Sequence, residues 1–109
     1  MSSSLTRAAE VQPPSEGNVL VISVTGTSAA TDISSLQGSW VTFAAEDEAI
    51  YYVVGDSTVE ADPAATTGDT RCGILPAGQS TSWFYGKEKA YTHIALECTS
   101  AATARLWQS

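Results

Sequence analysis

The chain has 109 residues, enough for one domain with its own core, and its hydrophobic content of 43% is typical of a folded protein. Twelve acidic residues against five basic ones give a formal net charge of −7, which argues against binding to nucleic acid or to an anionic membrane surface. Only 16% of the residues are charged, and the small neutral side chains that replace them suit permanent packing against another protein.

Residues 1–17 are predicted to form a flexible or extended arm ahead of a β-sandwich domain at residues 18–109. The arm ends in Gln-Pro-Pro-Ser-Glu-Gly at residues 12–17, and adjacent prolines favour extended backbone. It has little to bury by itself, so we expect it to be mobile or ordered by a partner. No apolar run approaches the roughly 20 residues that span a bilayer, and the N-terminus lacks the basic-then-apolar order of a secretory signal.

Beyond the arm, short β-rich runs alternate with turn residues. Residues 18–24 are apolar on both faces, which predicts a strand covered on both sides. Gly26 and residues 28–32 break this run. Residues 40–43 alternate between apolar and polar, and residues 49–54 are predicted to pair back on them as a hairpin across an acidic turn.

The second half of the chain continues the same pattern. Residues 55–69 form a polar loop, and residues 70–75 form a short strand that ends at a type II turn over Pro-Ala-Gly 76–78. Three more strands are predicted at 80–85, 92–98 and 102–107. About seven strands with frequent turns and no amphipathic helix predict an all-β, single-domain antiparallel β-sandwich or jelly roll.

The alternation of the last strands predicts which side chains face outward. Ile94, Leu96 and Leu106 belong to the inward sets, because side chains two residues apart share a face of a strand. Phe84 has the parity opposite to Trp83 and Tyr85, so one side of that strand is also apolar and exposed. Aromatic outer faces indicate a neighbour or a ligand, unless a second sheet of the same domain covers them. The residues predicted to form an oligomer or partner interface are Tyr91, His93, Arg105 and Trp107.

Catalysis is not expected, because the sequence contains no convincing catalytic, cofactor or metal site. His93 is the only histidine, and its position in mid-strand favours a packed or hydrogen-bonded ring. Cys98 lies five residues later and therefore on the opposite face of the strand. The Gly-Asp-Ser triplet at residues 55–57 is ordinary turn chemistry. The chain is therefore predicted not to be an enzyme and to need no cofactor.

Metal binding and disulfide formation were weighed in the same way. The acidic side chains of loop 56–69 could supply oxygen ligands to calcium, but their spacing does not match an EF-hand loop. Solvated acids are the favoured interpretation of Asp56, Glu60, Asp62 and Asp69. Cys72 and Cys98 with one histidine make an incomplete zinc set. Both cysteines are expected to be reduced and buried, although one bridge stays open if their Cα atoms lie within about 7 Å.

Several segments behind the Ser/Pro arm carry a resemblance to a known class. They are Ile-Leu-Pro-Ala-Gly-Gln at 74–79, Trp-Phe-Tyr-Gly at 83–86, Thr-His-Ile-Ala-Leu at 92–96 and Ala-Arg-Leu-Trp-Gln-Ser at 104–109. In these the chain resembles the small β-sandwich virion proteins of tailed bacteriophages, of the capsid decoration (cement) type. The resemblance implies a structural protein of the capsid exterior, made in the host cytoplasm. It also implies a homo-oligomer, with a trimer favoured, that binds the major capsid protein or another virion protein.

Two other functions stay open from the residues alone. Another small virion component, in the head–tail junction, the tail or a fibre attachment, would share this composition and fold. A carbohydrate-binding module would instead use an exposed aromatic platform, for which Trp40, Trp83, Trp107 and Tyr91 are the candidates. The copy number relative to coat protein distinguishes the virion positions, and sugar titration distinguishes the module.

Overall fold

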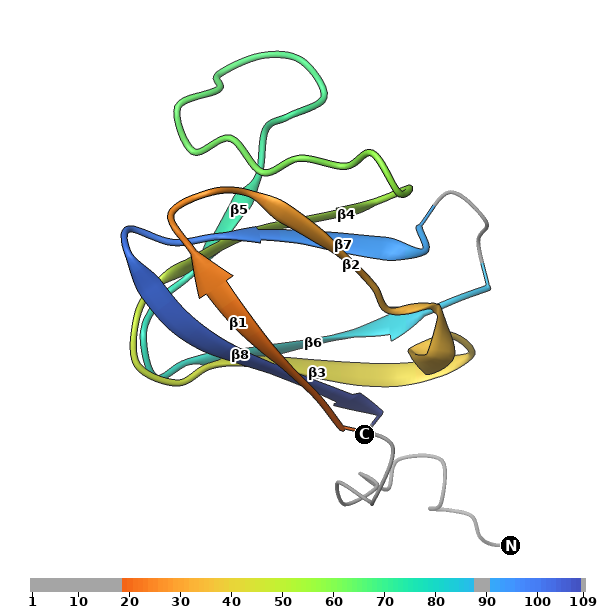
Figure 1. Ribbon diagram of the computed structural model, residues 1–109. Helices are drawn as coiled ribbons and strands as arrows, with labels where there is room; N and C mark the ends of the chain where they lie inside the picture. The colour runs from red at the N-terminus through yellow and green to blue at the C-terminus, as the bar shows by residue number, and fades with distance from the viewer. Residues whose placement is uncertain (1–18, 88–90, 109) are drawn as a thin grey trace, which may run out of the picture.

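The computed structural model describes residues 19–87 and 91–108, and in this part of the chain eight β-strands form two antiparallel sheets (Figure 1). The predicted arm, residues 1–17, lies outside the described residues. The strands in chain order are β1 (Val19–Thr25), β2 (Ala29–Asp32), β3 (Ser39–Ala45), β4 (Ile50–Gly55), β5 (Gly73–Leu75), β6 (Ser80–Tyr85), β7 (His93–Glu97) and β8 (Ala101–Gln108), with one 3-10 turn, η1 (Ser34–Leu36), between β2 and β3.

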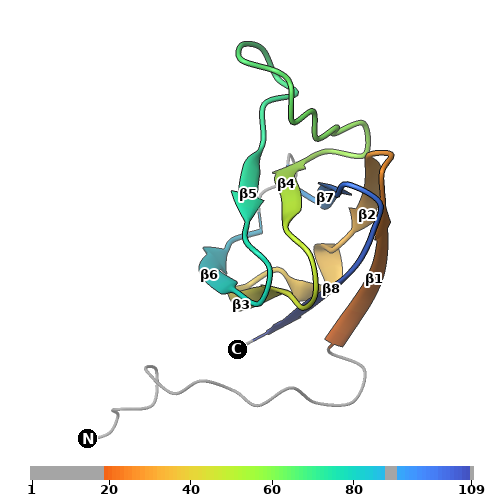
Figure 2. The same ribbon diagram turned by 90° about the vertical axis from the view of Figure 1, so that its left-hand side faces the viewer.

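The two sheets have the strand orders of a jelly roll. Sheet 1 runs β1-β8-β3-β6, and sheet 2 runs β2-β7-β4-β5. Every strand that has a successor, except β4, is followed in the chain by a strand of the opposite sheet, so the chain crosses repeatedly between the two layers (Figure 2). The predicted all-β antiparallel sandwich or jelly roll is confirmed, and the double four-stranded arrangement identifies the jelly roll.

The core lies between the sheets and follows the alternation of the strands. Phe43 of β3 and Leu106 of β8 are fully buried from sheet 1, and Ile50 and Ile94 are fully buried from sheet 2. The ring of Phe43 packs edge-on against Tyr52 of β4, with ring centroids 4.9 Å apart, and joins the two layers. Most of the predicted inward sets of the last two strands are buried: Ile94, Leu96, Cys98, Ala102, Ala104 and Leu106. Thr92, which was also predicted to face inward, precedes β7 and is half-buried.

The predicted hairpin between residues 40–43 and 49–54 is wrong. The strand β3 pairs with β6 and β8, whereas β4 pairs with β5 and β7. The acidic turn at residues 46–48 therefore carries the chain from one sheet to the other. Short-range sequence signals define a turn between two strands, but they do not specify whether the second strand pairs with the first.

Two other strand predictions need correction at the start of the chain. The first strand is not covered on both sides: β1 is an edge strand of sheet 1, and Val21 on its outer side is 57% exposed. Residues 28–32 do not merely interrupt the pattern, because Ala29–Asp32 form β2 and pair with β7. This strand has no apolar alternation of its own, so its pairing with β7 specifies it.

The long polar loop is confirmed and extends from residue 56 to residue 72, which shortens the predicted strand 70–75 to β5. It folds over the outer side of sheet 2 (Figure 1), where Ala61 is buried and its N–H donates to the Ser28 hydroxyl at 2.9 Å. The loop packs closely at its start, since a Cβ on Gly55 would lie 2.8 Å from Val59 Cγ2. The outer side of sheet 2 is thus partly covered by the chain itself.

The turn over residues 76–79 has the predicted form. The Gln79 N–H donates to the Pro76 carbonyl at 3.1 Å, and Gly78 has a φ of +75°, as the third position of a type II turn requires. In residues 19–87 and 91–108, no helix has the length and hydropathy of a membrane-spanning segment.

Candidate functional site

The outer side of sheet 1 carries a stripe of exposed apolar side chains. Trp40 of β3 and Phe84 of β6 lie opposite each other in register, and they are 51% and 58% exposed. Their rings meet edge to face, with centroids 6.1 Å apart and planes inclined by 75°. Trp107 of β8 lies beside Thr42 and is therefore a diagonal neighbour of Trp40, close enough for large side chains to interact. We call Val19, Val21, Trp40, Phe84 and Trp107 the aromatic face.

The strand register explains why these residues share one surface. Val19 pairs with Trp107 across β1 and β8, and Trp107 pairs with Thr42 across β8 and β3. Alternate side chains of a strand point to the same side of a sheet, so the inward Val41 and Phe43 place Trp40 and Thr42 outside. Thr42 and Ser82 lie in the same row as Trp107, and the small side chains Ala44 and Ser80 lie in the next row away from Trp40 and Phe84.

Charge is nearly absent from the aromatic face and is compensated where it occurs. Arg105 of β8 forms a salt bridge with Glu46, which follows β3, and both side chains are exposed. The neighbouring Asp47 carboxylate accepts the Thr103 N–H at 3.2 Å. These groups lie toward the end of the sheet away from Trp40 and Phe84, and they therefore resemble the polar rim of an interface.

The four residues predicted as one interface lie on different sides of the molecule. Arg105 and Trp107 are on the outer side of sheet 1, whereas His93 is on the outer side of sheet 2 and Tyr91 precedes β7. A single shared surface for all four is wrong, because β7 and β8 belong to opposite layers and their outward faces point apart. The assignment of each residue to some interface stays a prediction.

His93 makes a local hydrogen bond on the outer side of sheet 2. Its Nδ1 lies 2.8 Å from the Thr92 hydroxyl, and the strand register places Asp32 and Gly55 on either side of it. Asp32 is already engaged, since its carboxylate accepts both the N–H and the hydroxyl of Ser34 at 2.8 and 2.7 Å. These hydrogen bonds lower the pKa of Asp32. Cys98 is buried on the inner side of the sheet, as the spacing predicts.

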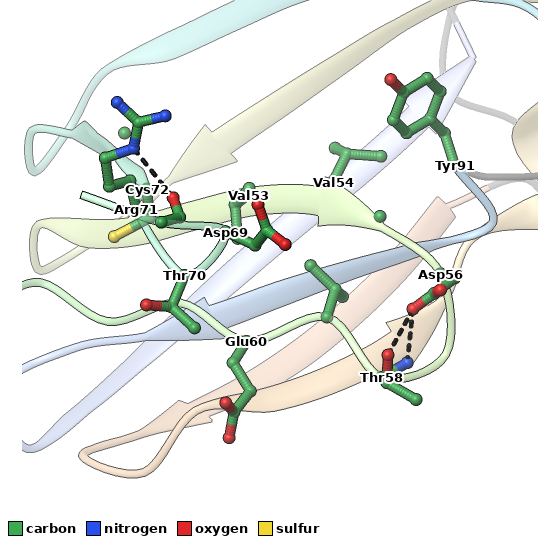
Figure 3. Close-up of a pocket in the computed structure, with 14 residues that line it drawn as sticks. Val53, Val54, Asp56, Thr58, Glu60, Asp69, Thr70, Arg71, Cys72 and Tyr91 are labelled. Carbon is green, nitrogen blue, oxygen red and sulfur yellow. Dashed lines mark hydrogen bonds between the residues drawn. The ribbon is translucent and has the colours of Figure 1, made fainter. Parts of the chain in front are cut away.

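A pocket of about 670 Å³ lies between the loop 56–72 and β4 (Figure 3). Its carboxylates Asp56, Glu60 and Asp69 point in different directions in this view. Asp56 accepts the N–H and the hydroxyl of Thr58 at 2.9 and 2.7 Å, and these bonds lower its pKa. Among the described residues no group of three or more acidic, histidine or cysteine side chains is arranged to hold a metal ion. Of the acids of this loop, Asp56 and Asp62 accept hydrogen bonds within local turns.

The cysteines are both free thiols, so the disulfide that the sequence left open is not formed. Cys72 lines the loop pocket, and burial raises the pKa of its thiol. Burial likewise raises the pKa of Cys98, whose Sγ lies 3.5 Å from the Val24 carbonyl oxygen. A raised pKa reduces the thiolate fraction, which is opposite to the change that activates a cysteine nucleophile.

A second, almost wholly apolar groove of about 410 Å³ lies between β4 of sheet 2 and β6 of sheet 1. We call it the aromatic groove. The Tyr85 hydroxyl donates to the Tyr91 carbonyl and ties the two sides of this region together, and burial raises the pKa of Tyr85. The side chains that line the groove are Tyr52 and Val54 from β4, Trp83, Phe84 and Tyr85 from β6, and Gly86 and Tyr91.

Sequence reasoning identified single aromatic residues but not their grouping. The opposite parity of Phe84 to Trp83 and Tyr85 was readable from the sequence, but it left open which side is exposed, and the structure shows that Phe84 is the exposed ring. The sequence pattern does not specify which strands are neighbours in each sheet. The pairing of Trp40 with Phe84 depends on that order, and so does the separation of Trp83 from the other two tryptophans.

No protein-family model and no curated protein sequence matches the chain. Among solved structures, the chain is similar to a de novo designed double-stranded β-helix determined in solution by NMR. That likeness has 14% sequence identity and a TM-score of 0.48, and it covers 84% of this chain and 97% of the designed one.

Proposed function

We propose that this chain is a structural assembly protein that associates with further copies of itself through the aromatic face. The observation that carries the proposal is the exposed pair Trp40 and Phe84, continued by Trp107 across sheet 1. Monomeric proteins rarely leave contiguous apolar surface of this kind exposed unless it is functional. Buried tryptophan and other aromatic side chains supply much of the binding energy at protein interfaces.

The surroundings of these rings suit a second copy of the same chain. A molecule with a net charge of −7 repels its own copies unless they meet through a neutral surface. The aromatic face is such a surface, because its described charges, Arg105 and Glu46, pair with each other at the rim. Its small alanine and serine side chains also lose little rotamer entropy when a partner covers them.

Within this role we propose a virion protein, specifically a capsid decoration protein on the outer surface of a phage head. Jelly rolls are frequent among viral capsid domains, and this supports the proposal at the level of fold. The acidic charge favours a position away from packaged DNA. The resemblance to small decoration proteins adds a homotrimer and the major capsid protein as partner. The role requires no catalytic step and no cofactor.

The test is to purify the particles of the phage whose genome encodes the chain and to count the copies of the chain in each particle. A decoration protein is expected in a fixed proportion to the coat protein and is stripped from intact heads without releasing DNA from the interior. A few copies in each particle would favour a head–tail, tail or fibre-attachment position. Absence from the particles would contradict a virion role altogether.

A carbohydrate-binding module is the second candidate, because the Trp40 and Phe84 rings form an exposed platform and jelly rolls also occur among lectins. Sugar rings stack their apolar faces on such side chains. Titration of oligosaccharides against tryptophan fluorescence tests this function. Saturable quenching in the wild type that disappears in Trp40→Ser would favour the module over self-association.

A further inference from the structure

We propose that the aromatic groove binds the proline-containing segment at residues 11–15 of a second copy of the chain. The proposal is independent of any virion role, since it requires only that two copies meet. The groove is lined by four rings that are at least partly exposed, Tyr52, Trp83, Phe84 and Tyr91, and by the buried Tyr85, and its lining is almost wholly apolar. Aromatic-lined grooves of this kind recognise proline-rich segments, because proline fixes an extended backbone before binding and loses little entropy on docking.

The strand that borders the groove has an unpaired edge suited to an extended occupant. On one side β6 pairs with β3, and in the described part of the chain no strand pairs with its other side. The Ala45 N–H donates to the Gln79 carbonyl at 3.0 Å. In an antiparallel pair the peptide groups of alternate residues point to the same neighbour, so those of every second residue from Gln79 onward are directed toward β3. The peptide groups of Ser80, Ser82 and Phe84 consequently face the free edge, where an extended segment finds hydrogen-bonding partners.

The groove also contains donors without protein acceptors. Neither the Trp83 indole N–H nor the Tyr52 hydroxyl has a hydrogen-bond partner among the described residues. Half-buried tryptophan and tyrosine side chains usually find a polar partner. A proline-containing segment offers backbone carbonyls as acceptors and, at its prolines, presents no N–H that would need one.

The chain itself contains one segment with this chemistry. Of the four prolines, Pro63 lies in the loop 56–72 and Pro76 lies in the tight turn before β6. Pro13 and Pro14 are the adjacent pair, and they follow Val11-Gln12 and precede Ser15. Adjacent prolines restrict both their own backbone and that of the preceding residue to extended conformations.

The short distance that the arm can span favours the groove of a second copy over the groove of the same chain. Val19 begins β1, which lies at the edge of sheet 1 opposite to β6, three strand spacings or about 14 Å away. Pro14 precedes Val19 by five residues, a fully extended span of about 17 Å. A path from β1 must cross the sheet above Trp107 and Trp40, continue along β6 and turn around its edge into the space between the sheets. The lateral crossing alone takes most of the extended span, which leaves little chain for the run along β6 and the turn around its edge, whereas a neighbouring copy meets no such limit.

The test mixes two full-length variants that each lack one half of the contact. The first is ¹⁵N-labelled and carries Pro13→Ala and Pro14→Ala, so its groove is intact and its own arm cannot dock. The second is unlabelled and carries Tyr91→Ala, so its arm is intact and its groove is impaired at an exposed side chain. Adding the second to the first is expected to shift the Trp83 indole N–H resonance progressively to a plateau.

Two further variants of the unlabelled protein, which donates its arm, control for unspecific contact. A donor with Tyr91→Ala and Pro63→Ala should produce the same shift, because Pro63 is an exposed loop proline outside the segment. A donor with Tyr91→Ala, Pro13→Ala and Pro14→Ala should leave the Trp83 resonance unmoved. The Trp40 and Trp107 resonances report separately on association through the aromatic face, so failure of that proposal is distinguishable from failure of this one.

Three results would overturn the inference. The first is a Trp83 resonance that stays fixed up to millimolar donor. The second is an equal shift with the donor that lacks both arm prolines. The third is a wild-type Trp83 resonance that differs from that of the proline variant by the same amount at every dilution, since this is the signature of docking within one chain.

Discussion

Trp40 and Phe84 face each other across β3 and β6 on the outer side of sheet 1, with ring centroids 6.1 Å apart, and more than half of each side chain is exposed. The pair is therefore stabilised by its own edge-to-face contact but is not covered by the rest of the described chain. An aromatic pair in this position contributes little to folding and is available to a partner.

The first prediction concerns this pair. Trp40→Ser and Phe84→Ser should shift the protein toward monomers, each at a cost of about 2 kcal/mol per interface or about thirtyfold in association. Sedimentation velocity over a concentration series measures the shift. Ile74→Ser is the matched control, because Ile74 is 52% exposed on sheet 2. A wild type that is monomeric at every accessible concentration would contradict self-association.

A second prediction compares two phenylalanines on opposite sides of sheet 1. Phe43→Ala should lower the free energy of unfolding by about 3–5 kcal/mol, because the fully buried ring leaves a cavity between the sheets. Phe84→Ala should cost far less in the monomer, since Phe84 is mainly exposed. Urea unfolding followed by circular dichroism measures both. Similar losses for the two variants would show that the aromatic face is part of the folding core.

The close approach of Val59 to Gly55 leads to a third prediction. Gly55→Ala should destabilise the protein by about 1–3 kcal/mol, because the added Cβ would lie 2.8 Å from Val59 Cγ2 and force the loop to shift. Val59 Cβ would also lie only 2.9 Å from the added Cβ, so combining Gly55→Ala with Val59→Gly should recover part of the loss, and a double-mutant cycle measures the coupling. Strictly additive effects would mean that the loop moves away from β4 without cost.

A fourth prediction follows from the hydrogen bonds of Asp56. Its folded-state pKa lies below the ordinary 3.8, because the Thr58 hydroxyl and N–H bind the ionised carboxylate. A group with a lowered pKa contributes stability above its unfolded pKa and loses it as the pH falls through its folded pKa. Thr58→Val should raise the pKa of Asp56, and Thr58→Ser should preserve it. Carboxyl ¹³C NMR titration below pH 5 gives both values, and an unchanged pKa in Thr58→Val would refute the assignment.

The fifth prediction is that both thiols react slowly in the native protein. Burial raises the pKa of Cys72 and of Cys98, so each has less thiolate at pH 8 than a free cysteine. Cys98 is also buried on the inner side of the sandwich and should react with Ellman's reagent only after unfolding. Cys72→Ser and Cys98→Ser assign the two rates. Rapid native labelling of Cys98 would mean that the end of β7 opens readily.

The local pattern of the chain was sufficient for individual strands but not for their neighbours. The strand β6 has the predicted bounds, and the inward sides of β7 and β8 follow from alternation, because side-chain parity is a property of each strand by itself. The strand β2 could not be found this way, since Ala-Ala-Thr-Asp has no apolar period and depends on β7.

The assignment of strands to the two sheets, which the sequence pattern does not specify, limited the site prediction as well. His93 and Trp107 were each placed correctly on the outer side of a strand, yet their strands lie in opposite layers. The alternation of side chains within one strand does not show which strands contribute to the same outer surface. The aromatic face arises from β1, β3, β6 and β8, and the aromatic groove from β4, β6 and the segment before β7. These elements are distant in sequence, so only the folded sheets bring their side chains together.

The position of β8 determines when the molecule can fold during its synthesis. The last strand lies between β1 and β3 in sheet 1, so the first strand has no partner until residues 101–108 have left the ribosome. Until then the nascent chain exposes the inner side of β1 and one edge of β3 to the crowded cell. Pairings that join the two ends of a chain form slowly, because their loop-closure entropy is lost before the contacts are gained. Productive folding of this domain is therefore expected only once β8 has emerged, and the first strand stays unpaired until then.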